Sequence, residues 1–365
     1  MTYVLTRTAV RIVVALVALL LMATAAPARA DRPGPAIIEV PVRFDVVNVN
    51  RSKVLCPTDG GQYEMVGHLV APVDALDDPS PAVTIYLPGA VSTERMAWRQ
   101  KAGGGDYDVA RGMAARGHIS ITLDRLSMGN SGVPNGFLHC LGGEAAAVDQ
   151  VTDQLRAGGY RIDGREPVAF DRIALAGHSY GGFVASTTAL SFHGVDAVLL
   201  IASAADQLAP VGFLTGLVEE GVAECGHGGF PKREGGPGGY ATLLPIHERI
   251  WGEVDPDVKT DYIGRAERES CGQLSSLGPA LLASRLLAHT VDVPMLFVAA
   301  ENDWIFPPDR MQAQQRLFRG SRDSTYVEIA NAGHMLIVEQ GLADGSPASR
   351  RVQDALSDWL TPRGF

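Results

Sequence analysis

The arrangement of apolar and polar positions changes along the chain. Residues 38–49 and 65–70 alternate between apolar and polar side chains, which predicts two strands that bury only one face. Farther along, short and largely apolar segments alternate with longer segments of helical character. The apolar segments predict further strands at residues 83–87, 119–123, 173–176, 197–201, 295–299 and 325–329. The longer segments predict helices at residues 108–116, 144–157, 182–191 and 346–360.

Strands that are apolar throughout and separated by helices are typical of a parallel sheet with helices on both faces. The pattern therefore predicts an α/β fold. In such a sheet, ligands bind beyond the carboxyl ends of the strands. The residues that follow each strand are the first candidates for a functional site.

The alternation is interrupted between residues 206 and 290. Within this stretch, residues 226–240 are rich in glycine and proline and have no hydrophobic period, and segments that could be helices flank them at residues 211–222 and 277–287. A structureless loop of this length would be unusual in a compact domain. We therefore expect residues 206–290 to be an insertion with elements of its own. The core is thereby divided into two parts, residues 31–205 and 291–365.

The first thirty residues have the composition of an export signal. Arg7 and Arg11 precede an apolar run at residues 12–26, and the Ala-Arg-Ala that ends at Ala30 matches the small-x-small pattern of signal peptidase sites. We expect residues 1–30 to be a signal peptide that is cleaved after Ala30, and the mature chain to be secreted. The alternative is an uncleaved membrane anchor, although an apolar run of about fifteen residues is shorter than the roughly twenty that span a bilayer.

The charge of the chain argues against polyanionic partners. The formal net charge is −10 at pH 7, and loss of the three arginines in residues 1–30 leaves −13. Nucleic acids and anionic membranes repel a chain this acidic. No later segment of the sequence is long and apolar enough to span a membrane. We expect the partner of the mature protein to be a small, uncharged molecule, and the sequence does not indicate an oligomeric state.

The chain contains four cysteines. In an exported protein an even number favours disulfides, and four cysteines allow three pairings. We favour Cys225 with Cys271, because both lie in the predicted insertion, which leaves Cys56 with Cys140. The alternative is a metal site at Cys225, His227 and Cys271, but a Cys-x-His without a second close pair is a weak signal. No cofactor and no other metal is expected.

The segment Gly-His-Ser-Tyr-Gly at residues 177–181 is the strongest chemical signal. It follows the predicted strand at residues 173–176 and precedes the predicted helix at residues 182–191, which is the context of a nucleophile elbow. In that turn only small residues fit on either side of the serine. The start of the helix presents N–H groups and the positive end of its dipole beside the hydroxyl. We therefore predict that Ser179 is a nucleophile.

A serine hydroxyl needs a base that takes its proton, and an imidazole base needs a carboxylate that fixes its tautomer. His334 directly follows the last predicted strand, at the edge of the sheet where Ser179 should also lie. Asp303 follows the strand before it and is the predicted carboxylate. Glu301 and Asp206 are alternatives, since each also comes after a predicted strand.

Two backbone N–H groups are expected to stabilise the negative charge of the reaction intermediate. One is that of Tyr180, which follows the serine, and the other is that of Ala90, in the loop after the predicted strand at residues 83–87. The segment at residues 124–131 is interpreted either as a pocket wall or as a structural turn. Apolar side chains near the predicted site favour an uncharged, hydrophobic substrate, and those expected to line its pocket are Leu126, Met128, Trp304 and Met335.

Together these features resemble the α/β-hydrolase superfamily along nearly all of the mature chain. Residues 177–182, 300–308 and 331–334 carry the similarity, and the chain order serine, aspartate, histidine is typical of that fold. The resemblance implies a mostly parallel sheet of eight strands and a cap over the active site, formed here by residues 206–290. The chain departs from the family in two ways: Pro-Gly at residues 88–89 replaces a His-Gly pair, and the His-Gly-Gly-Gly motif of many lipases and esterases is absent.

Three functions are compatible with this pattern. The first is an exported serine hydrolase that cleaves carboxylic esters of small, uncharged, hydrophobic substrates through an acyl-enzyme. The second is an aminopeptidase or amidase with the same Ser-His-Asp triad, in which Glu219, Glu220 and Glu224 of the insertion would hold a substrate amine. The third is a binding protein that keeps the fold without activity, and the intact set of three predicted catalytic residues argues against it.

Overall fold

The computed structural model describes residues 35–365 except 105–106, 206–210 and 244–249. The chain falls into two units, Met1–Pro35 and Ala36–Phe365, and the description below concerns the second. The predicted signal peptide at residues 1–30 lies outside the described residues. None of the helices in the described part of the chain has both the length and the apolar character that a bilayer crossing requires.

A nine-stranded sheet runs through the unit in the order β11-β10-β7-β6-β3-β4-β2-β1-β5. The strands from β3 and β4 through β6 and β7 to β10 and β11 pair in parallel, whereas β1, β2 and β5 are antiparallel to their neighbours. The bounds of the strands are β1 (Ile37–Val47), β2 (Gln62–Pro72), β3 (Ala82–Leu87), β4 (Ser120–Leu123), β5 (Arg161–Ile162), β6 (Arg172–His178), β7 (Ala197–Ile201), β10 (Met295–Ala300) and β11 (Ser324–Ile329).

The predicted α/β fold is therefore confirmed, and the sheet is mostly parallel. It has nine strands where the resemblance implied eight. The additional strand, β5, consists of two residues that pair with Val42 and Arg43 at the outer edge of β1. Ion pairs from Arg161 to Asp45 and Glu64 hold it there. Two residues are too few to produce a hydrophobic period, so this strand could not be predicted from the pattern of apolar positions.

The burial of the strands explains the two apolar patterns. Val42, Phe44 and Val46 of β1 are buried while the intervening Asp45 is exposed, as expected for a strand with one covered face. By contrast, β7 and β10 are buried at every residue. Helices cover both faces of these central strands, so that neither face can be polar.

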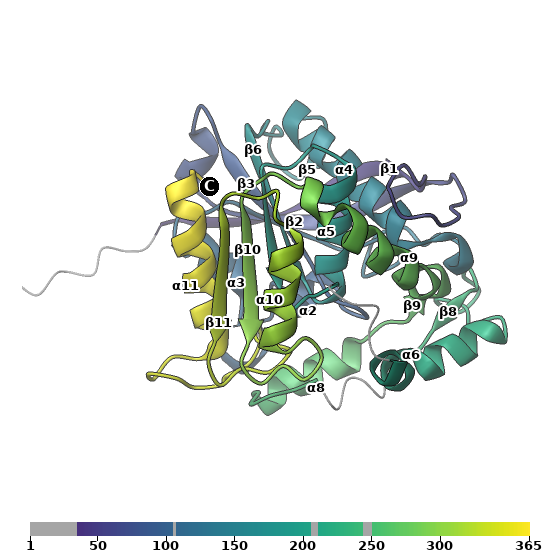
Figure 1. Ribbon diagram of the computed structural model, residues 1–365. Coiled ribbons are helices and arrows are strands. Elements are labelled where there is room, and N and C mark those ends of the chain that lie inside the picture. The colour runs from purple at the N-terminus through teal and green to yellow at the C-terminus, as the bar shows by residue number, and fades with distance from the viewer. Residues whose placement is uncertain (1–34, 105–106, 206–210, 244–249) are drawn as a thin grey trace, which may run out of the picture. The chain divides into compact units, whose positions relative to one another are not determined.

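The helices form two layers (Figure 1). Helices α3 and α11 pack against each other on one face of the sheet, and α4, α5 and α10 lie on the other face. The bounds of the helices are α2 (Glu94–Ala97), α3 (Val109–Ala115), α4 (Leu141–Ala157), α5 (Tyr180–Ser191), α6 (Val211–Gly226), α8 (Pro256–Arg265), α9 (Cys271–Leu287), α10 (Pro308–Leu317) and α11 (Ala348–Leu360). Short 3-10 turns lie at Val73–Asp77, Ala102–Gly104, Gly136–Leu138, Ala288–Thr290 and Thr361–Arg363.

Helix α11 illustrates how an apolar stripe fixes such a layer. Val352, Leu356 and Leu360 recur every fourth residue and are fully buried, whereas Asp354 and Asp358 are exposed. Helix α10 has no such stripe, because its buried residues are Met311 and Gln314 alone. It was accordingly not predicted from the sequence.

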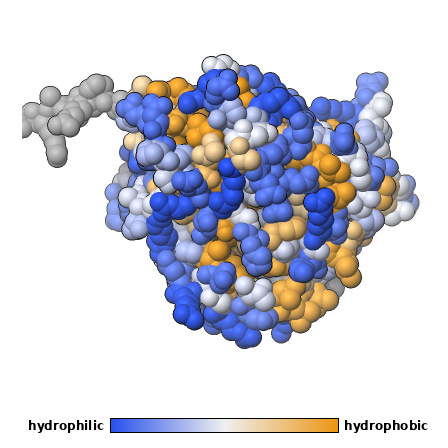
Figure 2. All heavy atoms as spheres, turned by 90° about the horizontal axis from the view of Figure 1, so that it is seen from above, coloured by the Kyte–Doolittle hydropathy of each residue, from blue (hydrophilic) through white to orange (hydrophobic). Residues whose placement is uncertain are grey.

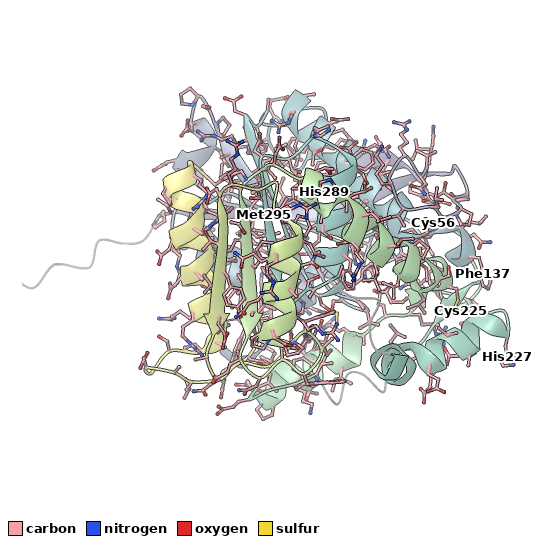
Figure 3. The ribbon with its side chains drawn as sticks, in the orientation of Figure 1. Cys56, Phe137, Cys225, His227, His289 and Met295 are labelled. Atoms are coloured by element: carbon pink, nitrogen blue, oxygen red, sulfur yellow. A yellow bond between two sulfur atoms is a disulfide. The ribbon has the colours of Figure 1, made fainter. Side chains whose placement is uncertain are left out.

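The carboxyl ends of the parallel strands lie at the lower edge of the sheet. Met295, labelled in the upper half of Figure 3, marks the beginning of β10, and the strand runs downward from there. The opposite face, at the amino ends of these strands, is seen in Figure 2, where hydrophilic side chains predominate and apolar ones are dispersed among them. Residues that follow the strands therefore gather at the edge away from the face in Figure 2.

Between β7 and β10 the chain forms elements outside the large sheet. These are α6, α8, α9 and the small antiparallel pair β8 (Tyr240–Ala241) and β9 (Glu269–Ser270). Figure 1 shows α8 below the carboxyl ends of the strands and α6 at the lower right, while α9 packs against α4 and α5. The predicted start of the insertion, Asp206, lies outside the described residues, and its boundaries stay a prediction.

Two disulfides join distant parts of the chain, Cys56 with Cys140 and Cys225 with Cys271. The favoured pairing is thus confirmed, and Cys56 and Cys225 can be located in Figure 3. The first disulfide fastens the segment after β1 to the residue that precedes α4, and the second joins α6 to the first residue of α9. The alternative metal site at Cys225, His227 and Cys271 is wrong, because the two sulfur atoms that it requires as thiolates are bonded to each other.

The second disulfide closes a loop with a sequence separation of 46 residues. Replacing both partners (Cys225→Ala with Cys271→Ala) should lower the free energy of unfolding by about 4 kcal/mol, because the unfolded chain regains the entropy of that loop. Urea-induced unfolding measures the change. The single variant Cys225→Ala should lose a similar amount, and a double variant as stable as the wild type would contradict the expectation.

Candidate active site

Ser179 lies in the tight turn between β6 and α5. Its backbone has φ 51° and ψ −118°, a conformation that residues other than glycine rarely adopt. The glycines around it leave no room for a larger residue: a Cβ on Gly177 would lie 2.2 Å from the Gly181 carbonyl oxygen, and one on Gly181 would lie 2.3 Å from the Leu87 carbonyl oxygen. The close contacts explain the Gly-x-Ser-x-Gly spacing, and the turn leaves the half-buried Ser179 hydroxyl beyond the end of the sheet.

The structure brings His334 and Asp303 together with Ser179. The His334 Nε2 atom lies 2.9 Å from Ser179 Oγ, and His334 Nδ1 lies 2.9 Å from Asp303 Oδ2. With the proton on Nδ1, the ring donates to the aspartate and accepts from the serine hydroxyl. The three residues follow β6, β10 and β11, so their meeting depends on the parallel order of those strands.

Asp303 is nearly fully buried and carries its negative charge. Its Oδ1 atom accepts hydrogen bonds from the N–H groups of Ile305 at 2.8 Å and Phe306 at 3.0 Å. Burial alone would raise the pKa of this carboxyl, but His334 and the two N–H groups outweigh it and hold the pKa below its ordinary value. Of the two alternative carboxylates, Glu301 instead accepts from the Asn331 N–H at 2.7 Å. The other, Asp206, lies outside the described residues.

His178 fixes the segment that carries His334. Its Nε2 atom donates to the His334 carbonyl oxygen at 2.9 Å, and the two ring centroids are 5.1 Å apart. Burial, together with the neighbouring His334, lowers the pKa of His178 to about 3, so this side chain is neutral at pH 7. The sequence alone does not reveal this contact, because the two residues are 156 positions apart.

Glu339 holds the same segment from the other side. Its carboxylate accepts hydrogen bonds from the N–H groups of Gly333 at 2.5 Å and Met335 at 3.1 Å, which flank His334. It also accepts from the Gly252 N–H at 2.7 Å, in the part of the chain between β7 and β10. Burial raises the pKa of Glu339. Its one signal in the sequence is that the glutamate directly follows four apolar residues, 335–338, where a buried charge would need hydrogen-bond partners.

The loop after β3 lies against the turn that carries Ser179. A Cβ on Gly89 would be 3.3 Å from the Ser179 Cβ and 3.2 Å from His178 Nδ1. The loop therefore places Ala90, one of the two predicted oxyanion donors, next to the serine. The other predicted donor, Tyr180, is the first residue of α5, where backbone N–H groups have no partner within the helix.

The residues predicted to line a pocket fall into two groups. Trp304 and Met335 directly follow Asp303 and His334 in the chain; Trp304 is 48% exposed and Met335 is buried. Leu126 and Met128 are fully buried in the turn after β4. In that turn the Leu126 N–H donates to Glu144 and the Met128 N–H donates to the Arg125 carbonyl oxygen. These contacts favour the interpretation of residues 124–131 as a structural turn, and the pocket role of all four side chains stays a prediction.

Among the described residues, no group of three or more His, Cys, Asp or Glu side chains is arranged to hold a metal ion. The chemistry that the geometry can supply is proton transfer from the Ser179 hydroxyl to His334, with Asp303 stabilising the resulting imidazolium.

The chain matches a known protein family and resembles several solved structures. The alpha/beta hydrolase family model matches residues 84–344. Comparison with curated proteins finds no match. Among solved structures, the chain is similar to a thermophilic esterase from Thermogutta terrifontis at 19% identity and a TM-score of 0.58, over 88% of this chain and 98% of that chain.

Two further structures show the same likeness. The enol-lactonase from Burkholderia xenovorans LB400 has 14% identity and a TM-score of 0.56, over 82% of this chain and 97% of that chain. The monoacylglycerol lipase from Paleococcus ferrophilus has 15% identity and a TM-score of 0.54, over 77% of this chain and 94% of that chain. At such low identities the likeness shows the fold.

The lowered pKa of His178 has a consequence for stability. Below the ordinary histidine pKa of 6.5 the unfolded chain binds a proton that the folded chain does not take up until about pH 3, so acid favours unfolding. Between pH 7 and pH 5 this effect should lower the free energy of unfolding by about 2 kcal/mol. The variant His178→Gln, which has no titrating ring, should lose less stability than the wild type over that interval, as measured by urea unfolding at both pH values. Equal losses in the two proteins would show that His178 does not contribute.

Proposed function

Because the chain belongs to the alpha/beta hydrolase family, we propose that it hydrolyses carboxylic esters through an acyl-enzyme formed on Ser179. The observation that carries the proposal is the continuous pair of 2.9 Å hydrogen bonds from Ser179 through His334 to Asp303. The positive-φ turn that presents the serine supports it as well, since backbone strain of this kind is concentrated at active sites.

The reaction proceeds in two steps. Ser179 Oγ attacks the ester carbonyl carbon while His334 Nε2 takes the hydroxyl proton, and Asp303 stabilises the resulting imidazolium. The N–H groups of Tyr180 and Ala90 donate hydrogen bonds to the carbonyl oxygen as it becomes negative. His334 then returns the proton to the leaving alcohol. A water molecule, activated by the same histidine, cleaves the acyl-enzyme and releases the acid.

An uncharged, hydrophobic substrate fits the surroundings of these residues. The centre of the Phe306 ring lies 5.7 Å from that of the His334 ring and 5.7 Å from that of the Phe183 ring, and Phe183 packs at a right angle to Tyr180. Aromatic and aliphatic side chains around a few polar groups are typical of sites for small apolar ligands. The similar solved structures include an esterase, an enol-lactonase and a lipase, which favours an ester bond as the one cleaved.

The proposal includes export of the mature chain. The predicted signal peptide at residues 1–30 and the two disulfides support it, because disulfides persist in oxidising compartments. The amidase alternative receives less support. Glu219 and Glu220 are exposed, and the Glu224 carboxylate accepts from the Thr242 N–H at 2.7 Å. Turnover of amino-acid anilides compared with short-chain esters separates the two activities.

Replacing the proposed nucleophile tests the function directly. The variant Ser179→Ala should lower kcat for a p-nitrophenyl ester by at least about 10⁴-fold, because no acyl-enzyme can form. It should also abolish labelling by a fluorophosphonate probe. Ser186→Ala is a matched control, since this buried hydroxyl lies in α5, the helix that follows Ser179, and donates within that helix to the Phe183 carbonyl oxygen at 3.1 Å. Retained turnover in Ser179→Ala would contradict the proposed function.

The role of Asp303 can be separated from that of Glu301. Asp303→Asn should lower kcat by about 10³- to 10⁴-fold, because an amide favours the wrong tautomer of His334. Glu301→Gln keeps an oxygen for the Asn331 N–H and should retain kcat within about twofold. Steady-state kinetics on one ester compares the two variants. A larger loss of kcat in Glu301→Gln than in Asp303→Asn would show that Asp303 is not the catalytic carboxylate.

A further inference from the structure

A fully buried ion pair lies behind the loop that follows β3. Arg125, in the turn after β4, donates to Glu269 of β9 at 2.5 Å, and neither side chain is more than 2% exposed. Both residues also bind the loop backbone. Arg125 Nη2 donates to the Gly89 carbonyl oxygen at 3.0 Å, and Glu269 Oε1 accepts from the Val91 N–H at 2.7 Å.

These two contacts fix the peptide units on either side of Ala90. In a trans peptide the carbonyl of one residue and the N–H of the next point in opposite directions, and there are no cis peptide bonds among the described residues. Because Arg125 holds the Gly89 carbonyl oxygen, the Ala90 N–H is directed away from the guanidinium. The next peptide unit, between Ala90 and Val91, is held at both ends. Its carbonyl oxygen, that of Ala90, accepts from Ser92 Oγ at 3.1 Å, and its N–H, that of Val91, donates to Glu269.

The same contacts decide which N–H group of the loop is available. The Val91 N–H is occupied by Glu269 and cannot bind a substrate oxygen. No partner is found for the Ala90 N–H among the described residues. Gly89, directly before it, lies against Ser179. Val91 itself has φ 57°, a conformation that a valine rarely adopts without being held in place.

Stability alone is a weak reason for such a pair. Removing two charges from water costs several kcal/mol for each ion, and apolar residues of similar volume often serve the folded state as well or better. The guanidinium of Arg125 also stacks 4.7 Å from the centre of the Tyr180 ring, so that it touches the residue that carries the other expected donor. A role in the site accounts for contacts that a purely structural role leaves without a reason.

We propose that Arg125 and Glu269 are positioning residues that set the Ala90 N–H as the second oxyanion donor. The proposal rests on the function proposed above and deepens it. Glu269 belongs to the part of the chain between β7 and β10, so the oxyanion site is complete only when that part has folded onto the core. Neither side chain contacts the reacting atoms, and both act through the backbone of residues 89–91.

The deciding variant replaces both partners together, Arg125→Met with Glu269→Leu, so that no unpaired charge is left buried. It should keep its melting temperature within a few degrees, because an apolar pair can replace a buried ion pair. Its kcat for a p-nitrophenyl ester should nevertheless fall by about 30- to 1,000-fold, with KM changed by less than about threefold, since an oxyanion donor acts on the transition state. Affinity for a trifluoromethyl ketone, whose adduct with Ser179 carries the oxyanion, should fall in parallel.

Two single variants separate the effect on the loop backbone from other effects of changing this buried cluster. Glu269→Gln keeps an oxygen for the Val91 N–H but loses its charge, and should lose about tenfold in kcat. Gln273→Met is the matched control, because Gln273 accepts from Arg125 at 3.3 Å without touching the loop; it should stay within about threefold of the wild type. If the double variant fails to fold, Arg125→Lys takes its place. Its shorter side chain does not reach Gly89 and Glu269 as Arg125 Nη2 does, and its ammonium cannot stack on the Tyr180 ring, so this variant should lose at least about tenfold in kcat.

A folded double variant with wild-type kcat would overturn the proposal, as would an equal loss in Gln273→Met. If the double variant does not fold, wild-type kcat in both Arg125→Lys and Glu269→Gln would overturn it. The premise, ester hydrolysis at Ser179, is tested separately on the wild-type protein. If the wild type neither turns over esters nor reacts at Ser179 with a fluorophosphonate, the proposed function fails. If it does both while the variants keep full kcat, only the role of Arg125 and Glu269 fails.

Discussion

The orientation of one ring, that of His334, is the constraint on which the site depends. The ring must meet a serine hydroxyl and a carboxylate at 2.9 Å on opposite edges, and the three residues come from three different loops. Hydrogen bonds are strongly directional, so a rotation of the ring would break one contact or the other. The fold answers this requirement by holding the backbone around the histidine, through the His178 ring on one side and the Glu339 carboxylate on the other.

The residues that the sequence identified are those whose position follows from local pattern. Ser179 stands between an apolar strand and a helix, and His334 and Asp303 each follow a strand. Parallel strands bring their carboxyl ends to one edge of a sheet, and that rule was sufficient to predict that the three side chains meet. The central strands were predictable as well, because burial on both faces leaves largely apolar segments such as β7 and β10.

The residues that the sequence did not identify act over long separations. His178 and His334 are 156 residues apart, and Arg125 and Glu269 are 144 apart. Nothing in the neighbourhood of either partner indicates the other, since a buried charge finds its counterpart only when the chain has packed. Short elements such as β8, β9 and β5 escaped prediction for a related reason: two residues carry no period.

The smallest strand of the sheet has a consequence for how the molecule meets others of its kind. An open sheet ends in a row of unpaired N–H and C=O groups that can template a neighbouring chain. At one end of this sheet, β5 pairs with only two residues of β1 and surrounds the edge with charges from Arg161, Asp45 and Glu64. An edge this short and this charged forms few hydrogen bonds with a second sheet. It therefore protects β1, the long strand next to it, from edge-to-edge association during folding at high local concentration.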